Sequence, residues 1–236
     1  MKLSPFDIHN HILPGVDDGF GNAADSLEAM KRMVESGCRD FVFTPHLNPE
    51  VFPNVDENKL KAAYDSFVPS IPAEWGVKTA LAAEYMVVGG FEERIASAPE
   101  ELLVFPDGSI LIEMSYSFRS INLEKVIFEL NMAGFRPVLA HPERYTYLAG
   151  RTDYFDKLQD IGCRFQLNLL SATGAYGPAS LKIMRYLLWH GMYSFVSSDL
   201  HSLAQLDRIL SYKPGILSGK KLKDLKEIEN KLLNLL

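Results

Sequence analysis

The chain has 236 residues, 47% of them hydrophobic and 23% charged, and its net charge at pH 7 is −6. This composition argues for a soluble, folded protein, and the negative charge argues against a nucleic-acid partner, which usually binds a basic face. The N-terminus lacks the apolar run of a signal peptide, and no stretch approaches the ~20 apolar residues of a membrane span, so we expect a cytoplasmic protein.

Strand-like and helix-like segments alternate along the chain. After an opening β-prone run at Phe6, the predicted strands are Asp40–His46, Val77–Met86, Ser109–Ser115, Arg136–Arg144, Arg164–Leu170 and Tyr193–His201. The predicted helices run from Asn22 or Asp25 to about Ser36, and then over Asp56–Phe67, Phe91–Ala98, Leu123–Ala133, Thr152–Ile161, Pro178–His190, Leu203–Tyr212 and Lys220–Leu236. This alternation predicts a parallel sheet with helices outside, and the absence of a linker or repeat predicts one domain over residues 1–236.

Side chains that bind metals gather where the predicted strands end. His9 and His11 are two residues apart, so an extended strand would point both imidazoles to one face. The turn at Pro14-Gly15 can then return Asp17 or Asp18 toward them. The other strand ends carry His46, Glu84, Glu113, His141, Asp199 and His201. Contributions from six strands favour a closed barrel, with its active site at the carboxyl ends of the strands, over an open doubly wound sheet.

The chemistry of these side chains favours a cluster of metal ions. Imidazoles and carboxylates without a nearby thiolate suit zinc, iron or manganese. The ligands are too many for one ion, because a catalytic zinc takes about three protein ligands, so we expect two to three divalent ions. Clustered ions suit phosphoester hydrolysis.

The two cysteines argue against a thiol mechanism. Cys38 and Cys163 open apolar, strand-like runs, where buried cysteines behave as small hydrophobes. Neither begins the Cys-x5-Arg loop of thiol phosphatases, because Thr44 and Leu169 stand where the arginine would be.

Six motif-like stretches lie between Phe6 and about Arg208. They are Asp7–His11 with Val16–Gly19, Thr44–His46, Ala83–Tyr85, Ile112–Ser115, Ala140–Tyr145 and Ser197–His201. In this order they resemble the PHP superfamily (polymerase and histidinol phosphatase), and within it the bacterial PHP-type protein tyrosine phosphatases of capsule and exopolysaccharide operons. The acids at positions 17, 18 and 113 favour this branch, because many other relatives carry histidine there.

The resemblance implies an α/β fold, a distorted (β/α)7 TIM-like barrel, and three metal positions. It implies His9, His11, Glu84 and Asp199 at the first position, the bridging Glu84 with Glu113 and His141 at the second, and His46, His201 and Asp17 or Asp18 at the third. It also implies phosphate-holding arginines. Arg144 matches the motif directly, Arg119 matches after a two-residue gap, and Arg208 follows His201 later than the family arginine does. Glu143, beside His141, can orient a ligand.

By the same resemblance, the chain is a metal-dependent phosphatase that hydrolyses phosphotyrosine with a metal-activated hydroxide. The expected partner is a bacterial tyrosine kinase that regulates capsular or exopolysaccharide synthesis. Aromatic residues of the loop Leu47–Val55, with Phe52, and of Tyr116–Phe118 are candidate walls of a phosphotyrosine cleft. Two alternatives stay open, namely another PHP phosphoesterase such as histidinol-phosphate phosphatase, and a non-catalytic, metal-stabilised regulator.

Overall fold

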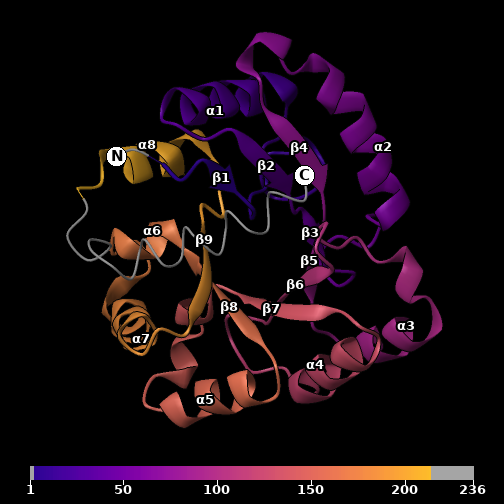
Figure 1. Cartoon of the computed structure of the whole chain (residues 1–236), viewed down its shortest axis with the longest axis vertical. Coiled ribbons are helices and arrows are strands. Elements are labelled where there is room, and N and C mark those ends of the chain that lie inside the picture. The colour runs from indigo at the N-terminus through magenta and orange to yellow at the C-terminus, as the bar shows by residue number, and fades with distance from the viewer. Residues whose placement is uncertain (1–2, 214–236) are drawn as a thin grey trace.

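The structure of the protein, a computed structural model, describes residues 3–213. The last predicted helix, Lys220–Leu236, lies outside them. Its strands lie inside a ring of helices, and Figure 1 shows α1 to α5 and then α7 and α8 following one another clockwise round the strands. Every helix within residues 3–213 falls short of a membrane span in length or apolar content.

The nine strands of the described residues form two sheets, in which all neighbours are parallel. One sheet has the order β1 (Phe6–Asp7), β2 (Asp40–Phe43) and β4 (Lys78–Leu81). The other has the order β3 (His46–Leu47), β5 (Glu84–Met86), β6 (Ser109–Glu113), β7 (Arg136–Ala140), β8 (Arg164–Asn168) and β9 (Tyr193–Ser197). All seven predicted strands are therefore present.

Two of the predicted strands are each divided in two. The strand predicted at Asp40–His46 is divided into β2 and β3, because Pro45 has no N–H to donate to a ladder. The strand predicted at Val77–Met86 is divided into β4 and β5. The two divided strands nevertheless stay paired across their breaks, because the Glu84 N–H donates to the Pro45 carbonyl at 3.1 Å. With each divided strand counted once, neighbours in space follow the order of the chain.

The first and last strands also lie side by side. An isolated parallel bridge joins Asn10 to Leu200, beyond the ends of β1 and β9. The His11 N–H donates to the Leu200 carbonyl at 3.0 Å, and the Asp199 N–H donates to the His9 carbonyl at 2.8 Å. These contacts, rather than a full ladder, bring the end of the strand order back to its start. The arrangement is that of the predicted TIM-like barrel.

The predicted helices are present within the described residues, together with one that was not predicted. The Asn22 side chain caps α1 by accepting the Asp25 N–H at 3.0 Å, which decides between the two predicted starts. The unpredicted helix, α6, begins where the Asn168 side chain accepts the Leu170 N–H at 2.7 Å. The helices are α1 (Ala23–Glu35), α2 (Glu57–Phe67), α3 (Phe91–Ser97), α4 (Leu123–Met132), α5 (Thr152–Asp160), α6 (Leu169–Ala172), α7 (Gly177–Trp189) and α8 (Leu203–Ser211).

Four strands, β6 to β9, end earlier than predicted, and two of them end close to residues with an unusual backbone. β7 ends at Ala140, directly before His141 with φ +34°, and β9 ends at Ser197, two residues before Asp199 with φ +50°. These are the two non-glycine residues with positive φ in the described chain. Left-handed backbone is unfavourable for residues with a Cβ and is retained mostly at functional sites.

Apolar side chains fill the interior of the ring below the strand ends. Val42 belongs to a different apolar cluster from its neighbours Phe41 and Phe43, as expected when side chains alternate between the two faces of a strand. Phe41 and Phe43 pack with helix residues, so the cluster of Val42 faces inward. It consists of Ile8, Val42, Ala82, Phe105, Leu111, Val138, Ala140 and Phe195. The barrel is therefore a packed core, and polar groups concentrate at its carboxyl end.

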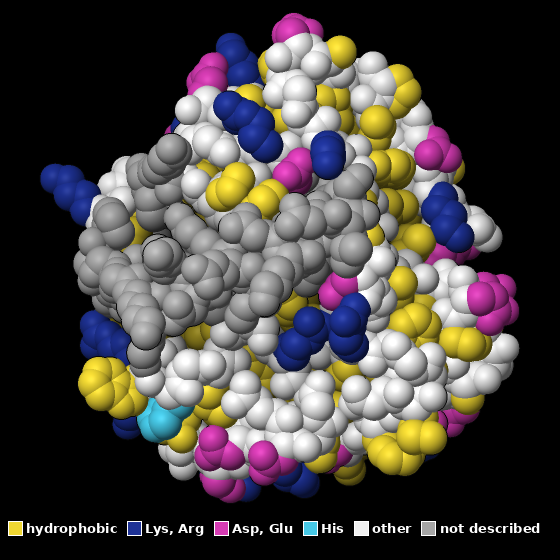
Figure 2. Space-filling view, viewed as in Figure 1, with side chains coloured by type: hydrophobic (Ala, Val, Ile, Leu, Met, Phe, Trp, Pro, Cys, Tyr) yellow, Lys and Arg dark blue, Asp and Glu magenta, His cyan; other side chains and the backbone are white. Residues whose placement is uncertain are grey.

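The surface mixes both signs of charge. Figure 2 shows basic and acidic side chains scattered among white and yellow atoms over the visible described part of one face.

Candidate metal centre

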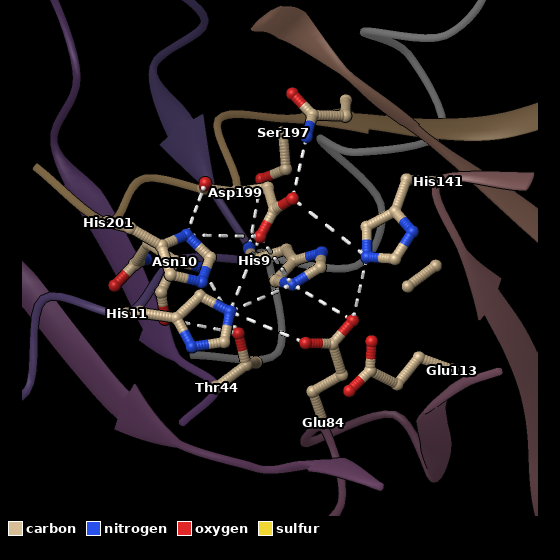
Figure 3. A network of polar contacts seen from close by, with 12 residues as sticks. His9, Asn10, His11, Thr44, Glu84, Glu113, His141, Ser197, Asp199 and His201 are labelled. Atoms are coloured by element: carbon tan, nitrogen blue, oxygen red, sulfur yellow. Dashed lines mark hydrogen bonds and ion pairs between the residues drawn. The ribbon is translucent and has the colours of Figure 1, made fainter. Parts of the chain in front are cut away.

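The strand ends bring the predicted metal-binding side chains to one place. Figure 3 shows imidazoles and carboxylates from separate strand ends pointing toward one another. They are His9, His11, His46, Glu84, Glu113, His141, Asp199 and His201, with Asp18 beside them. All but His201 and Asp18 are buried, so these groups form a polar cluster inside the protein.

The most buried part of this cluster contains four predicted ligands, His9, His11, Glu84 and Asp199. One ligand atom from each lies within 4.8 Å of all the others. The Nε2 atoms of His9 and His11 each lie 3.3 Å from Asp199 Oδ1. Each of these Nε2 atoms also lies 3.4 Å from one of the two Glu84 carboxylate oxygens. Two imidazole nitrogens and two carboxylates around one point suit a divalent cation.

Two further groups overlap this one. His46 Nδ1 lies 2.9 Å from Glu113 Oε1 and 3.1 Å from Glu84 Oε2, and these three residues form the second group. The third group contains His11, Asp18, His46 and His201. His141 was expected in the second group, and its Nε2 atom lies 3.0 Å from Glu84 Oε1. Glu84 therefore contacts residues expected at all three metal positions.

Hydrogen bonds turn three of the imidazoles so that Nε2 faces the cluster. In each ring Nδ1–H is assigned as the donor. His9 donates to Gln166 Oε1 at 2.9 Å, His11 donates to Asp17 Oδ2 at 2.7 Å, and His201 donates to the Asp199 carbonyl at 2.9 Å. A partner on Nδ1 leaves Nε2 unprotonated and available to a metal.

The two neighbouring aspartates have different environments. Asp17 is buried at the carboxylate, which accepts from His11 Nδ1, from the His46 N–H at 2.9 Å and from the Gly19 N–H at 3.0 Å. Burial raises the pKa of Asp17, but His11 outweighs it and holds that pKa at about 2. The Asp18 side chain is 62% exposed, and its Oδ1 lies 3.5 Å from His46 Nε2 and 3.7 Å from His201 Nε2. Asp17 is thus occupied in orienting its neighbours, whereas Asp18 is free to offer an oxygen to the third group.

Several atoms of the cluster fit a metal because the protein alone gives them no hydrogen bond, even where two of them, His46 Nδ1 and Glu84 Oε2, lie 3.1 Å apart. Among residues 3–213, this holds for Glu84 Oε2, Glu113 Oε2, Asp199 Oδ1, His46 Nδ1 and His141 Nδ1, all of them buried. Leaving such groups unpaired costs free energy. A divalent cation would satisfy the carboxylate oxygens, and the nitrogen and oxygen donors match the expected zinc, iron or manganese.

The buried charges of the cluster shift one another's pKa values. Burial raises the pKa of Glu84, but the surrounding imidazoles outweigh it and hold that pKa well below its usual range. Burial and His11 lower the pKa of His46, yet the carboxylates of Glu113 and Glu84 raise it to about 10. Burial and His11 lower the pKa of His201 to about 4. At neutral pH and without a metal, Glu84 is therefore ionised and His201 neutral, as metal ligands must be, whereas His46 is protonated and a bound cation would have to displace its proton.

The three candidate arginines lie in different places. Arg144 donates from Nη1 to Asp199 Oδ2 at 2.7 Å, and its guanidinium lies 4.2 Å from the ring centroid of Tyr116 and 4.3 Å from that of Tyr176. Arg119 instead lies over the ring of Tyr154 at 4.9 Å, with Glu124 3.6 Å from its Nη1. Arg208 donates to Thr173 Oγ1 at 2.9 Å. Of the three, only Arg144 contacts the cluster.

A cavity of about 620 Å³ opens beside the cluster, lined on its inner side by Asp18, His46 and Glu113. The predicted aromatic walls line it as well, with Phe52 on one side and Tyr116 to Phe118 on another. The Phe52 ring is stacked on that of His46, with 6.0 Å between the centroids. The predicted cleft walls therefore adjoin the metal cluster.

Two residues of the site were missed in the sequence, and one predicted role is not supported. Gln166 holds His9 and accepts the His141 N–H at 3.3 Å, and Asn168 Nδ2 donates to Asp199 Oδ2 at 2.6 Å. Both stand on β8, the strand to which no metal-binding residue was assigned, and their two-residue spacing was the available signal. Glu143 instead accepts hydrogen bonds from the Asn168 N–H and from the Ser171 and Tyr193 hydroxyls.

Comparisons with known proteins show what this chain is similar to. Residues 5–212 match the family model described as capsular polysaccharide synthesis, CpsB/CapC. The tyrosine-protein phosphatase YwqE of Bacillus subtilis is 30% identical over 198 residues, which are 84% of this chain and 77% of YwqE. The tyrosine-protein phosphatase CpsB of Streptococcus pneumoniae is 26% identical over 209 residues, 84% of this chain and 83% of CpsB.

A solved structure from a study of these two proteins, described there as metal-dependent tyrosine phosphatases, superposes with a TM-score of 0.78. It covers 97% of this chain and 94% of its own, at 27% identity. The predicted family, fold class and enzyme class are confirmed by these matches. The chain belongs to the CpsB/CapC family of capsular polysaccharide synthesis.

Proposed function

We propose that this chain is a metal-dependent protein tyrosine phosphatase. The observation that supports it most directly is the set of three overlapping groups of imidazoles and carboxylates at the inner side of an aromatic-lined cavity. The named activity of its relatives points the same way. We further propose that the chain is a single cytoplasmic domain and that its partner is a tyrosine kinase controlling polysaccharide synthesis.

The proposed ligands would hold two to three divalent ions of manganese, iron or zinc. The first ion would be held by His9, His11, Glu84 and Asp199, the second by Glu84, Glu113 and His141, and the third by Asp18, His46 and His201. His46 approaches acids with both ring nitrogens, and we assign it to the third position through Nε2, which lies nearest Asp18. Ions bound there would supply Lewis acidity. They would neutralise phosphate charge and lower the pKa of water, so that hydroxide is available at neutral pH to attack phosphorus.

The chain itself would orient the phosphate and let the phenol leave. Arg144 is held by Asp199 and two tyrosine rings, so its remaining N–H groups form a rigid donor for phosphate oxygens as charge develops. The leaving phenolate, whose parent pKa is ~10, needs little protonation. No covalent enzyme intermediate is required. Burial raises the pKa of Cys163 to about 12 and the pKa of Cys38 well above its usual range, so both stay thiols.

The test compares phosphotyrosine peptides with phosphoserine peptides, histidinol phosphate and nucleotides, using metal-replete full-length protein. Phosphotyrosine peptides should be hydrolysed at least about tenfold faster by kcat/KM, equivalent to ~1.4 kcal/mol of discrimination. A panel in which histidinol phosphate or a nucleotide wins by that margin would assign another phosphoesterase activity to the same site. Absence of turnover on every substrate would favour the non-catalytic regulator.

A further inference from the structure

The cavity beside the cluster is larger than a phosphotyrosine side chain alone requires. Its volume of about 620 Å³ lies within the ~300–1,000 Å³ of pockets that bury most of a drug-sized ligand. It is continuous with the proposed metal site, because Asp18, His46 and Glu113 line it. A substrate that places its phosphate at the cluster therefore has neighbouring atoms inside the cavity.

The outer wall of this cavity concentrates exposed apolar side chains. Of the seven large hydrophobic side chains that the described residues expose, the cavity is lined by four: Val51, Tyr116, Phe118 and Ile121. The exposed fraction reaches 61% at Val51, 65% at Phe118 and 90% at Ile121. Val51 belongs to the loop after β3, and the other three follow β6, so two loops contribute. Exposed apolar side chains that gather round one cavity are typical of a binding site.

The charged groups of the wall narrow the choice of ligand. Besides Asp18 and Glu113 of the cluster, the charged lining residues are Glu50 and Arg119. Arg119 lies against Tyr154 and Glu124, which partly neutralises it. The outer cavity therefore combines apolar and uncharged polar side chains with an acidic edge at Glu50. An apolar side chain gains from burial there, whereas an acidic one meets a like charge.

We propose that Val51, Phe118 and Ile121 form a subsite for an apolar residue of the substrate that lies two positions from the phosphotyrosine. This rests on the proposed phosphatase function. In an extended peptide, the residue two positions away lies ~7 Å along the chain and projects to the same face as the phosphotyrosine. It would therefore enter the same cavity. The occupant is thus a phosphotyrosine segment with an aliphatic or aromatic neighbour and without acidic residues close by.

The experiment uses short phosphotyrosine peptides that differ at one residue, either two positions before or two positions after the phosphotyrosine. This residue is leucine, serine or glutamate. An aryl phosphate without a peptide serves as the reference substrate. Leucine at the preferred position should raise kcat/KM by about 5- to 30-fold over serine, mostly through KM, the factor expected from one to two kcal/mol of burial. Glutamate should be the poorest residue, and Glu50→Gln should reduce its disadvantage.

Variants of both loops assign the preference to the wall. In Ile121→Ser, Phe118→Ser and Val51→Ser, the ratio between the leucine and serine peptides should fall toward one. A general loss of activity or folding cancels in this ratio, because both peptides meet the same enzyme. Phe128→Ser is the matched control, since Phe128 is 59% exposed on α4 and does not line the cavity. Its ratio should equal that of the wild type.

The outcomes separate the two proposals. If the wild type hydrolyses the aryl phosphate and all the peptides equally well, the subsite is wrong and the phosphatase stands. If the leucine preference survives in all three wall variants, the subsite lies elsewhere and the proposal is again wrong. If the metal-replete wild type turns over neither aryl phosphate nor peptide, the proposed function fails and the subsite fails with it.

Discussion

The metal cluster and the outer cavity wall share one cleft but are built in opposite ways. The cluster consists of polar side chains at strand ends, nearly all buried, and bonds from β8 and the Asp17 turn fix their orientation. The wall consists of apolar side chains on two loops, exposed by up to 90% at Ile121. A rigid polar site suits chemistry that is the same for every substrate, and variable loops suit recognition. Substitutions in the cluster should therefore affect all substrates, whereas those in the wall should discriminate among them.

Metal removal tests the cluster side of this comparison most severely. A chelator should abolish turnover of peptides and aryl phosphates alike, and manganese, iron or zinc should restore part of it. Glu84→Ala should lose metal and at least about a thousandfold in activity together, since Glu84 contacts all three expected positions and metals supply several kcal/mol. Metal analysis and aryl phosphate turnover measure both effects. Glu74→Ala is the control, because Glu74 is an exposed acid in the short turn Ala73–Trp75. Full activity of metal-free enzyme would contradict the metal-dependent mechanism.

Substitution of Arg144 tests whether a residue that contacts the metal cluster acts on phosphate without binding a metal itself. Arg144→Ala should lower kcat/KM by about one to three orders of magnitude on every substrate, the range for losing one transition-state donor. Arg144→Lys should rescue poorly, because lysine lacks the planar fork. Metal content should stay near wild type. Arg151→Ala is the matched control, since Arg151 is exposed and paired with Asp153. Equal kinetics of the two alanine variants would remove Arg144 from the site.

Gln166 tests whether the orientation of the ligands matters as much as their presence. Gln166→Ala removes the partner of His9 Nδ1 and of the His141 N–H. Metal affinity should weaken by about 10- to 100-fold, the usual effect of losing a partner that orients a ligand. Gln159→Ala is the control, because Gln159 on α5 donates to the Met192 carbonyl. Titration of metal into stripped protein gives both affinities, and a wild-type affinity in Gln166→Ala would argue that the strand alone orients His9.

The cysteines should show the smallest effect on turnover. Cys38→Ser and Cys163→Ser should keep most of the wild-type kcat, because neither thiol lines the cavity or belongs to the cluster. Each should destabilise the fold by roughly 1–3 kcal/mol, since a hydroxyl replaces a buried thiol. Thermal unfolding and aryl phosphate turnover separate the two effects. Loss of turnover in a folded, metal-replete variant would reopen a thiol mechanism.

The strands, and the gathering of the candidate metal ligands at their carboxyl ends, could be predicted from the sequence because both follow simple rules. Alternating buried strands and capped helices specify parallel β/α units, and carboxyl strand ends meet at one edge. The sequence left Asp17 and Asp18 unresolved, because which carboxylate accepts the His46 N–H depends on how the turn packs. Gln166 and Asn168 were missed since amides in a strand carry no metal motif. The partners of Arg119 and Arg208 come from other helices or loops, which spacing along the chain cannot reveal.

The left-handed backbone at His141 and Asp199 lowers the stability of the fold at two positions that the proposed function needs. A residue with a Cβ in this conformation stores about 1–3 kcal/mol of strain, which glycine would release. Both side chains are also proposed ligands, so the substitutions that relax the backbone remove the metal site. A laboratory selection for heat resistance alone should therefore accumulate inactive variants at positions 141 and 199. A selection that scores turnover as well must find its stability elsewhere.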